Sequence, residues 1–151
     1  MADVSGTLTI TAGVTVRSDP QQVWDLAVDW SRQREWIWAT NTRGGRGLGA
    51  PVRARTGIGP LGFTDVMEIT VWEPPERCTV THTGSLVRGD GVFEVLPRPD
   101  RVEFRWTEHI MLPVTLPPAL ERQAFALLAP VARLGLGYSL ARFARLLPPG
   151  R

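Results

Sequence analysis

The sequence has a single cysteine, Cys78, and no lysine among its 151 residues. One cysteine excludes an intrachain disulfide and fits a reducing compartment. The seventeen cationic side chains are all arginine, and they are spread along the chain among fifteen acidic residues. This even distribution argues against a nucleic-acid-binding patch. The exclusive use of arginine is typical of a GC-rich genome.

Long apolar runs are also scarce. The first sixteen residues, MADVSGTLTITAGVTV, have neither a basic region nor an apolar core of about seven residues, so we expect no secretory signal. The longest apolar run, residues 124–132, is far shorter than the roughly 20 residues that span a bilayer. These features predict a cytoplasmic protein without stable membrane insertion. The length predicts a single domain over residues 1–151.

Familiar catalytic motifs are missing as well. The two histidines and the one cysteine form no HExxH or CxxC pair, which argues against a zinc site. No GxGxxG motif follows a strand and opens a helix, and 45-GRGLG-49 and 57-GIGPLG-62 are typical of hairpin loops. There is also no GxSxG nucleophile elbow. We therefore expect no metal and no organic cofactor.

The pattern of apolar residues predicts an α+β protein. Strict alternation predicts a strand over 7–16, and Ser18 with Gln21 fits a capping box for a helix over 20–28. A second short helix is predicted over 31–37, and the glycine-rich segment 40–62 is predicted to be loop apart from one short strand. The further strands are predicted at 51–56, 63–72, 77–83, 91–96 and 101–111. Strands segregated from helices indicate an antiparallel sheet.

Helical spacing of apolar residues returns over 119–147, with Leu120, Leu127 and Leu134 on one stripe. Pro130 lies inside this segment and is expected to kink or split the helix, because it removes a hydrogen bond and clashes with the preceding turn. The helix is the only large apolar element left to cover the sheet. Its other side is expected to help form a homodimer contact or to cover an end of the sheet, and the alternative is a helix that lies at a membrane surface.

Two segments carry a resemblance to a known family. The first is 18-SDPQQVWDLAVDWSRQREW-36, with Pro20, Trp24, Asp29 and Trp36 at typical spacing. The second is 68-EITVWEPPERCTVTHTG-84, where a strand ends in an acid and two prolines before an arginine. With the apolar last helix, they make the chain similar to the START-like superfamily, whose bacterial members include polyketide cyclase/dehydrase and lipid-transport proteins (SRPBCC proteins).

This resemblance implies a helix-grip fold, in which a seven-stranded antiparallel sheet wraps around a long C-terminal helix and encloses a deep apolar cavity. Members bind lipids, polyketides, sterols or other hydrophobic molecules, and some catalyse cyclisation or dehydration. The resemblance also implies that Trp36 lies near the cavity mouth, where we expect Trp30 and Trp38 to be half exposed. Trp24 is expected to anchor the first helix to the sheet.

Three polar residues fall on apolar strand faces. Alternation places Asp65, His82 and Glu108 on the side of the sheet that faces the expected cavity. Buried carboxylates must be paired or protonated, so these residues are candidate ligand anchors or acid–base catalysts. The alternative is that they lie at strand ends in solvent or pair with arginines such as Arg53 or Arg55.

The predicted function is therefore binding of a hydrophobic small molecule, by apolar contact and a few polar anchors. The alternative is a cofactor-independent aromatase/cyclase or dehydratase that uses His82, Glu108 and Asp65, and a third is an interaction module without a cavity. The predicted ligand-binding residues combine the polar candidates with apolar side chains: Trp36, Phe63, Asp65, Met67, His82, Phe104, Trp106, Glu108, Phe125 and Leu128.

Overall fold

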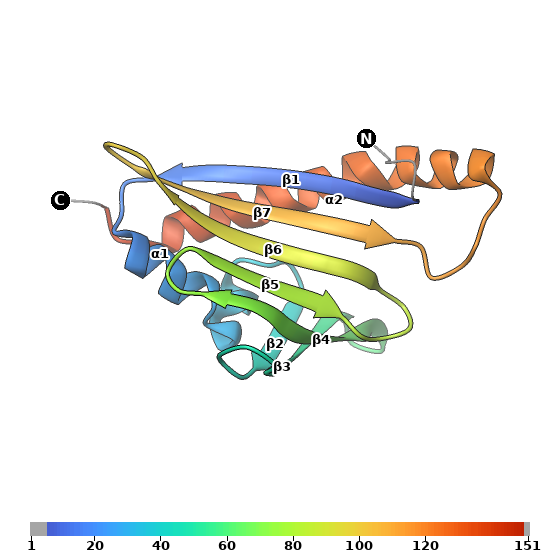
Figure 1. Cartoon of the computed structure of the whole chain (residues 1–151), viewed down its shortest axis with the longest axis horizontal. Helices are drawn as coiled ribbons and strands as arrows, with labels where there is room; N and C mark the ends of the chain where they lie inside the picture. The colour runs from blue at the N-terminus through green and yellow to red at the C-terminus, as the bar shows by residue number, and fades with distance from the viewer. Residues whose placement is uncertain (1–5, 150–151) are drawn as a thin grey trace.

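The computed structural model describes residues 6–149. Within this range, seven strands form one antiparallel sheet with the order β1-β7-β6-β5-β4-β3-β2 (Figure 1). The predicted α+β helix-grip fold is confirmed. The elements are β1 (Thr7–Val16), α1 (Pro20–Ala27), the 3₁₀ helix η1 (Trp30–Glu35), β2 (Thr40–Gly44), β3 (Pro51–Ile58), β4 (Leu61–Glu73), β5 (Arg77–His82), β6 (Arg88–Pro97), β7 (Val102–Met111) and α2 (Pro118–Leu146).

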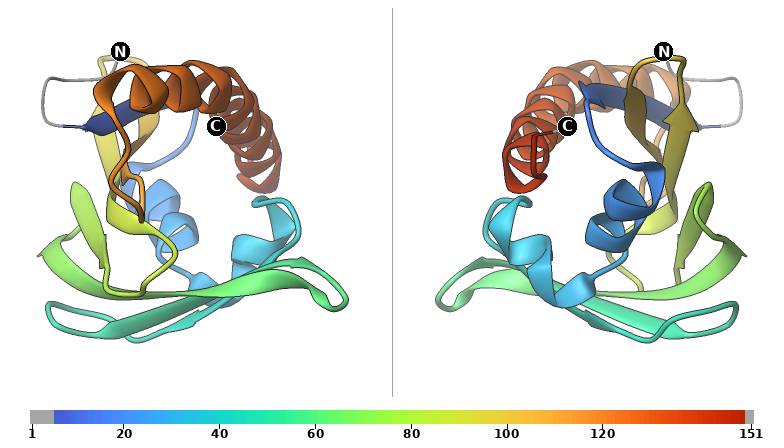
Figure 2. Two further views of the ribbon diagram at one scale, coloured as in Figure 1. Left: turned by 90° about the vertical axis from the view of Figure 1, so that its right-hand side faces the viewer. Right: turned by 90° about the vertical axis from the view of Figure 1, so that its left-hand side faces the viewer.

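The sheet is strongly bent, and α2 lies across its concave side (Figure 2). The N-terminal half of α2 packs against β1, whereas α1 and η1 cover β6 and β2. Because β1 pairs with β7 rather than with its neighbour in sequence, the first and last strands lie together beneath the last helix. The inner face of the sheet is therefore enclosed by helices from both ends of the chain.

The first helix begins one residue later than the predicted capping box requires. Asp19 is the N-cap residue, and its Oδ1 accepts a hydrogen bond from the backbone N–H of Gln21 at 2.8 Å. The hydroxyl of Ser18 instead donates to Gln22 Oε1. Trp24 is buried and packs edge-to-face on Trp72 of β4, with ring centroids 5.1 Å apart, as expected for an anchor of this helix.

The strand β2 is the element that sequence patterning missed, because its glycine-rich surroundings suggested loop. Thr40 and Thr42 point inward and are buried, while Asn41 and Arg43 are exposed. This two-residue alternation is carried by threonine rather than by large apolar side chains, so it gave no hydrophobic signal. The strand pairs with β3 over its whole length and thereby becomes the last strand of the sheet.

The last helix is continuous through Pro130, so of the two expected outcomes, a kink or a split, the split does not occur. Pro130 and Ala126 both lie on the solvent side, where water can hydrate the Ala126 carbonyl that receives no intrahelical hydrogen bond. The outward stripe also exposes Leu127, Val131 and Leu134. The homodimer stays a prediction, and this stripe is the surface that it would use.

By length and composition, α2 is also the one helix within residues 6–149 that would suffice to cross a membrane. Its mean hydropathy is 1.4 over the most apolar eighteen-residue window, and 22% of that window is buried. A helix that packs one face against a sheet meets the same test, and the buried residues of α2 lie on a single face. The criterion alone therefore assigns no membrane role to α2.

Candidate functional site

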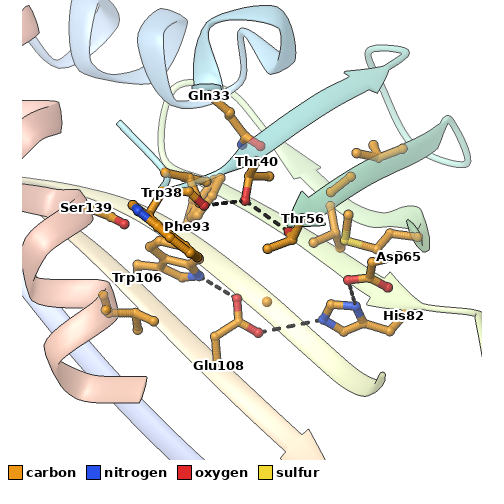
Figure 3. Close-up of a pocket in the computed structure, with 18 of the residues that line it drawn as sticks. Gln33, Trp38, Thr40, Thr56, Asp65, His82, Phe93, Trp106, Glu108 and Ser139 are labelled. Carbon is orange, nitrogen blue, oxygen red and sulfur yellow. Dashed lines mark hydrogen bonds and ion pairs between the residues drawn. The ribbon is translucent and has the colours of Figure 1, made fainter. Parts of the chain in front are cut away.

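A cavity of about 350 Å³ lies between the inner face of the sheet and the C-terminal half of α2. This volume is at the lower end of the range for small-molecule sites. Large apolar side chains make up most of its wall and come from elements far apart in the sequence: Trp30, Trp38, Met67, Phe93, Trp106 and Leu136. Polar side chains gather at two places on this wall (Figure 3).

The first polar group consists of Asp65, His82 and Glu108, which alternation placed on one face of the sheet. His82 lies between the two carboxylates, with Nδ1 2.7 Å from Asp65 Oδ2 and Nε2 3.7 Å from Glu108 Oε2 (Figure 3). The shorter distance has hydrogen-bond length, but the ring N–H is not aligned with it, so the contact is best described as an ion pair. None of the three pairs with Arg53 or Arg55.

Sheet register explains how residues on three different strands meet. His82 pairs across the ladder with Met67 of β4, so Asp65, two residues away on the same face, is its diagonal neighbour. Glu108 of β7 is separated from His82 by the intervening strand β6, whose inner face carries glycine opposite both residues, at Gly89 and Gly91. A Cβ at Gly91 would lie 2.9 Å from Glu108 Oε1. The Glu108 carboxylate therefore occupies the space that a side chain on β6 would fill.

The pKa of His82 is set by opposing effects. Burial lowers it, because only 7% of the side chain is exposed, but the close negative charges of Asp65 and Glu108 outweigh burial and raise the pKa to about 9. His82 is therefore an imidazolium at neutral pH. Glu108 is held in turn by Trp106, whose indole N–H donates to Oε1 at 2.6 Å. The imidazole separates the carboxylates, so the three groups do not converge on a point where a metal would bind.

The second polar group lies on β2 and β3 of the same sheet face, where Thr56 is two residues from Ala54, the partner of Asp65, and the sequence pattern did not predict it. Thr40 donates its hydroxyl hydrogen to the carbonyl of Trp38 at 2.9 Å, so Thr56 must donate to Thr40 across 3.0 Å. Thr56 then keeps a free acceptor position on the cavity side. Gln33, which lies beside Thr40, and Ser139 of α2 are both largely buried and also line the cavity (Figure 3).

Five of the ten predicted ligand-binding residues line the cavity: Asp65, Met67, His82, Trp106 and Glu108. Their role in binding stays a prediction. The other five lie elsewhere, so the expectation that they face the cavity is wrong. Trp36 and Phe104 are in the packed interior, and Phe125 and Leu128 pack where α2 meets β1. Phe63 lies near the N-terminal end of β4.

The reasons are geometric. Trp36 is fully buried and packs edge-to-face on Phe143, with ring centroids 5.0 Å apart, while Phe104 stacks on the same ring at 4.3 Å. These aromatic side chains fill the end of the interior behind the cavity wall. Phe125 and Leu128 lie on the part of α2 that packs against β1. Phe63 is 38% exposed, because β4 extends beyond the region that the helices cover.

Of the two tryptophans expected to be half exposed at the cavity mouth, one is and one is not. Trp38, which is 57% exposed, lines the mouth as predicted for a half-exposed residue. Trp30 lines the cavity but is only 5% exposed, because its indole N–H donates to the carbonyl of Gly45 at 2.7 Å and fixes the ring inside. Of the missed residues, Phe93 had a usable signal, since it alternates with Gly91 and Val95 on the inner face of β6.

Comparisons with known proteins find matches among solved structures but not among family models or curated sequences. No protein-family model matches the sequence, and neither does any curated protein. Many solved structures resemble this fold. The chain shares its helix-grip fold, a seven-stranded antiparallel sheet with a long last helix, with solved polyketide aromatase/cyclases and a Polyketide_cyc-like protein.

Three of these structures illustrate the likeness. The protein TTHA0849 from Thermus thermophilus is 16% identical, with a TM-score of 0.72, and the match covers 91% of this chain and 95% of that one. The Zhui aromatase/cyclase from a Streptomyces species is 14% identical, with a TM-score of 0.70 and 93% of both chains covered. The di-domain aromatase/cyclase StfQ of the steffimycin pathway is 10% identical, with a TM-score of 0.75, and this chain spans 50% of it. Such identities establish the fold alone.

Proposed function

We propose that this protein binds a hydrophobic small molecule reversibly in the cavity between the sheet and α2. The observation that carries the proposal is the composition of the wall, in which aromatic and aliphatic side chains surround two small polar groups. Apolar walls favour a ligand by removing its surface from water, and a few fixed polar groups orient it. The half-exposed Trp38 at the mouth offers an apolar surface to an entering ligand.

A neutral hydrophobic fluorophore, N-phenyl-1-naphthylamine, tests this proposal without knowledge of the natural ligand. The wild-type protein is expected to bind it with enhanced fluorescence. Ala132 lines the cavity and Ala126 lies on the exposed side of the same helix, so Ala132→Phe and Ala126→Phe form a matched pair. We expect Ala132→Phe to weaken binding about tenfold or more and Ala126→Phe to leave it unchanged. Equal binding by both variants, or none by the wild type, would refute the proposal.

A second candidate function is cofactor-independent catalysis of cyclisation or dehydration in the same cavity. The observation in its favour is His82 between two carboxylates, which offers an acid and a base within a few ångströms. In such a reaction a carboxylate would remove a proton next to a carbonyl, and His82 would protonate the hydroxyl that leaves as water. A pKa of about 9 makes His82 a weaker acid than the optimum near the working pH, so binding is the better-supported function.

Turnover of a linear poly-β-ketone thioester, followed by mass spectrometry of the products, separates these functions. Catalysis requires that His82→Ala lower the rate by about 100-fold or more, as loss of a general acid does. His109→Ala is the matched control, because His109 pairs with Asp90 on the outer face of the sheet. A binding protein shows no turnover in either variant or in the wild type.

A further inference from the structure

We infer that the site takes a hydrophobic ligand that carries a protonated amine, with the ammonium group bound at Glu108, and that it rejects carboxylates and phosphates. This inference rests on the proposed binding function and specifies the chemical class of the ligand.

The ionisable side chains of the cavity wall carry a net negative charge. Asp65, His82 and Glu108 are the only ionisable side chains among the described residues that line the cavity. Two carboxylates and one imidazolium leave one negative charge, and no arginine reaches the wall to balance it. An uncompensated charge in an apolar cavity is costly, so a ligand of opposite charge gains from neutralising it. A carboxylate or phosphate ligand would add like charge and bind poorly.

Glu108 has unused hydrogen-bonding capacity. Its Oε1 accepts from Trp106 Nε1, whereas its Oε2 is 3.7 Å from His82 Nε2, which is beyond hydrogen-bond distance. Oε2 can therefore still accept a hydrogen bond from a ligand. Glu108 is also the most open member of the group, with 17% of its side chain exposed against 12% for Asp65 and 7% for His82.

Aromatic side chains lie beside Glu108. The ring of Trp106 is held beside Glu108 by their hydrogen bond, and Phe93 packs against Trp106 with ring centroids 5.5 Å apart (Figure 3). A carboxylate beside an apolar aromatic surface thus suits an ammonium with an apolar body, while the rest of the wall accepts that body.

Three ligands with one ring system test the inference: 2-naphthylmethylamine, which is protonated at pH 7, 2-naphthalenemethanol and 2-naphthoate. Dissociation constants are measured by calorimetry at pH 7 with the wild-type protein. We expect the ammonium to bind about tenfold or more tightly than the alcohol, and the carboxylate to bind most weakly. Equal affinity for the ammonium and the alcohol, or tighter binding of the carboxylate, would overturn the inference.

The variant Glu108→Gln assigns the preference to one residue, because the amide keeps the shape and can still accept from Trp106. We expect the ammonium to lose its advantage while affinity for the alcohol changes less than threefold. Glu103→Gln, on the outer face of the same strand, is the matched control and should keep the advantage. Retention of the full preference in Glu108→Gln would contradict the assignment.

The two proposals fail in different ways. If N-phenyl-1-naphthylamine binds in the cavity but the ammonium shows no preference, charge selection is wrong and hydrophobic binding stands. If neither the fluorophore nor any naphthyl ligand binds, the proposed function falls and this inference falls with it. The ligand series on the wild-type protein decides between these results even where a variant does not fold.

Discussion

Folding moves His82 from water, where its pKa is 6.5, to a place between two carboxylates, where its pKa is about 9. The folded state thus binds this proton more tightly than the unfolded state does. The stabilisation from His82 is fully present below pH 6.5 and is lost as the pH rises through 9. We expect the free energy of urea unfolding to fall by about 1–3 kcal/mol over this window, allowing for partial screening by solvent.

The double variant Asp65→Asn/Glu108→Gln removes both charges that raise the pKa of His82, so its unfolding free energy should vary little across this pH window. His109→Gln serves as the control and should keep the wild-type fall. A wild-type protein whose stability is flat between pH 6.5 and 10 would show that His82 is not held as an imidazolium.

Gly91 determines whether Glu108 reaches His82 across β6. A methyl group at this position would lie 2.9 Å from Glu108 Oε1, closer than real contacts allow, so Gly91→Ala must displace the carboxylate. We expect the pKa of His82, measured by NMR titration, to fall from about 9 toward 6.5. In the control Gly84→Ala, the added Cβ meets nothing nearer than 3.8 Å, and the pKa should not move. An unchanged pKa in Gly91→Ala would show that Asp65 alone holds the proton.

The polar group illustrates which part of the site sequence can predict. Strict alternation within single strands placed Asp65, His82 and Glu108 on the correct face, because that face depends only on local backbone geometry. Their mutual contact depends on register between strands and on bare glycines in β6, which alternation within one strand does not report. The predicted position of Trp36 was wrong for a similar reason, since the rings that it contacts come from β6, β7 and α2.

At the scale of elements, the sequence predicted the long alternating strands and the last helix to within a few residues. These elements repeat their apolar period many times, as β7 does over Val102–Met111. The short strand β2 was not predicted, because a five-residue strand with threonine on its inner face has too few apolar positions to show a period. The missed strand carries Thr40, so an error in one element also removed a polar group from the predicted site.

Pro130 lies inside the last helix and cannot donate a backbone hydrogen bond. Because α2 is continuous and Pro130 is exposed, Pro130→Ala should restore the bond to the Ala126 carbonyl and stabilise the protein. We expect a gain of about 1–3 kcal/mol in the free energy of urea unfolding, since proline inside a helix costs roughly 3 kcal/mol.

The matched control is Pro118→Ala at the first residue of the same helix, where proline is well tolerated and the change should be small. A loss of stability in Pro130→Ala would contradict the prediction. It would mean that the proline sets a curvature that the packing of α2 on the sheet requires.

The whole molecule is predicted to unfold as one unit, although its interior divides into two apolar clusters. One cluster joins the sheet to α1, η1 and the end of α2, and the other joins β1 to the first half of α2. Ala12 and Trp106 pack against both clusters, so neither cluster can open without exposing part of the other. This shared packing favours a cooperative two-state transition.

Two spectroscopic probes report on different parts of this unit. All six tryptophans lie between residues 24 and 106, whereas most helical signal comes from α2, which has 29 residues. We expect tryptophan fluorescence and far-ultraviolet circular dichroism to give midpoints within about 2 °C, because two-state unfolding requires coincident probes. A bound ligand should raise both midpoints together, since sheet and helix each supply a wall of the cavity. An earlier loss of helix would show that α2 opens independently and that the cavity can form and empty without unfolding of the sheet.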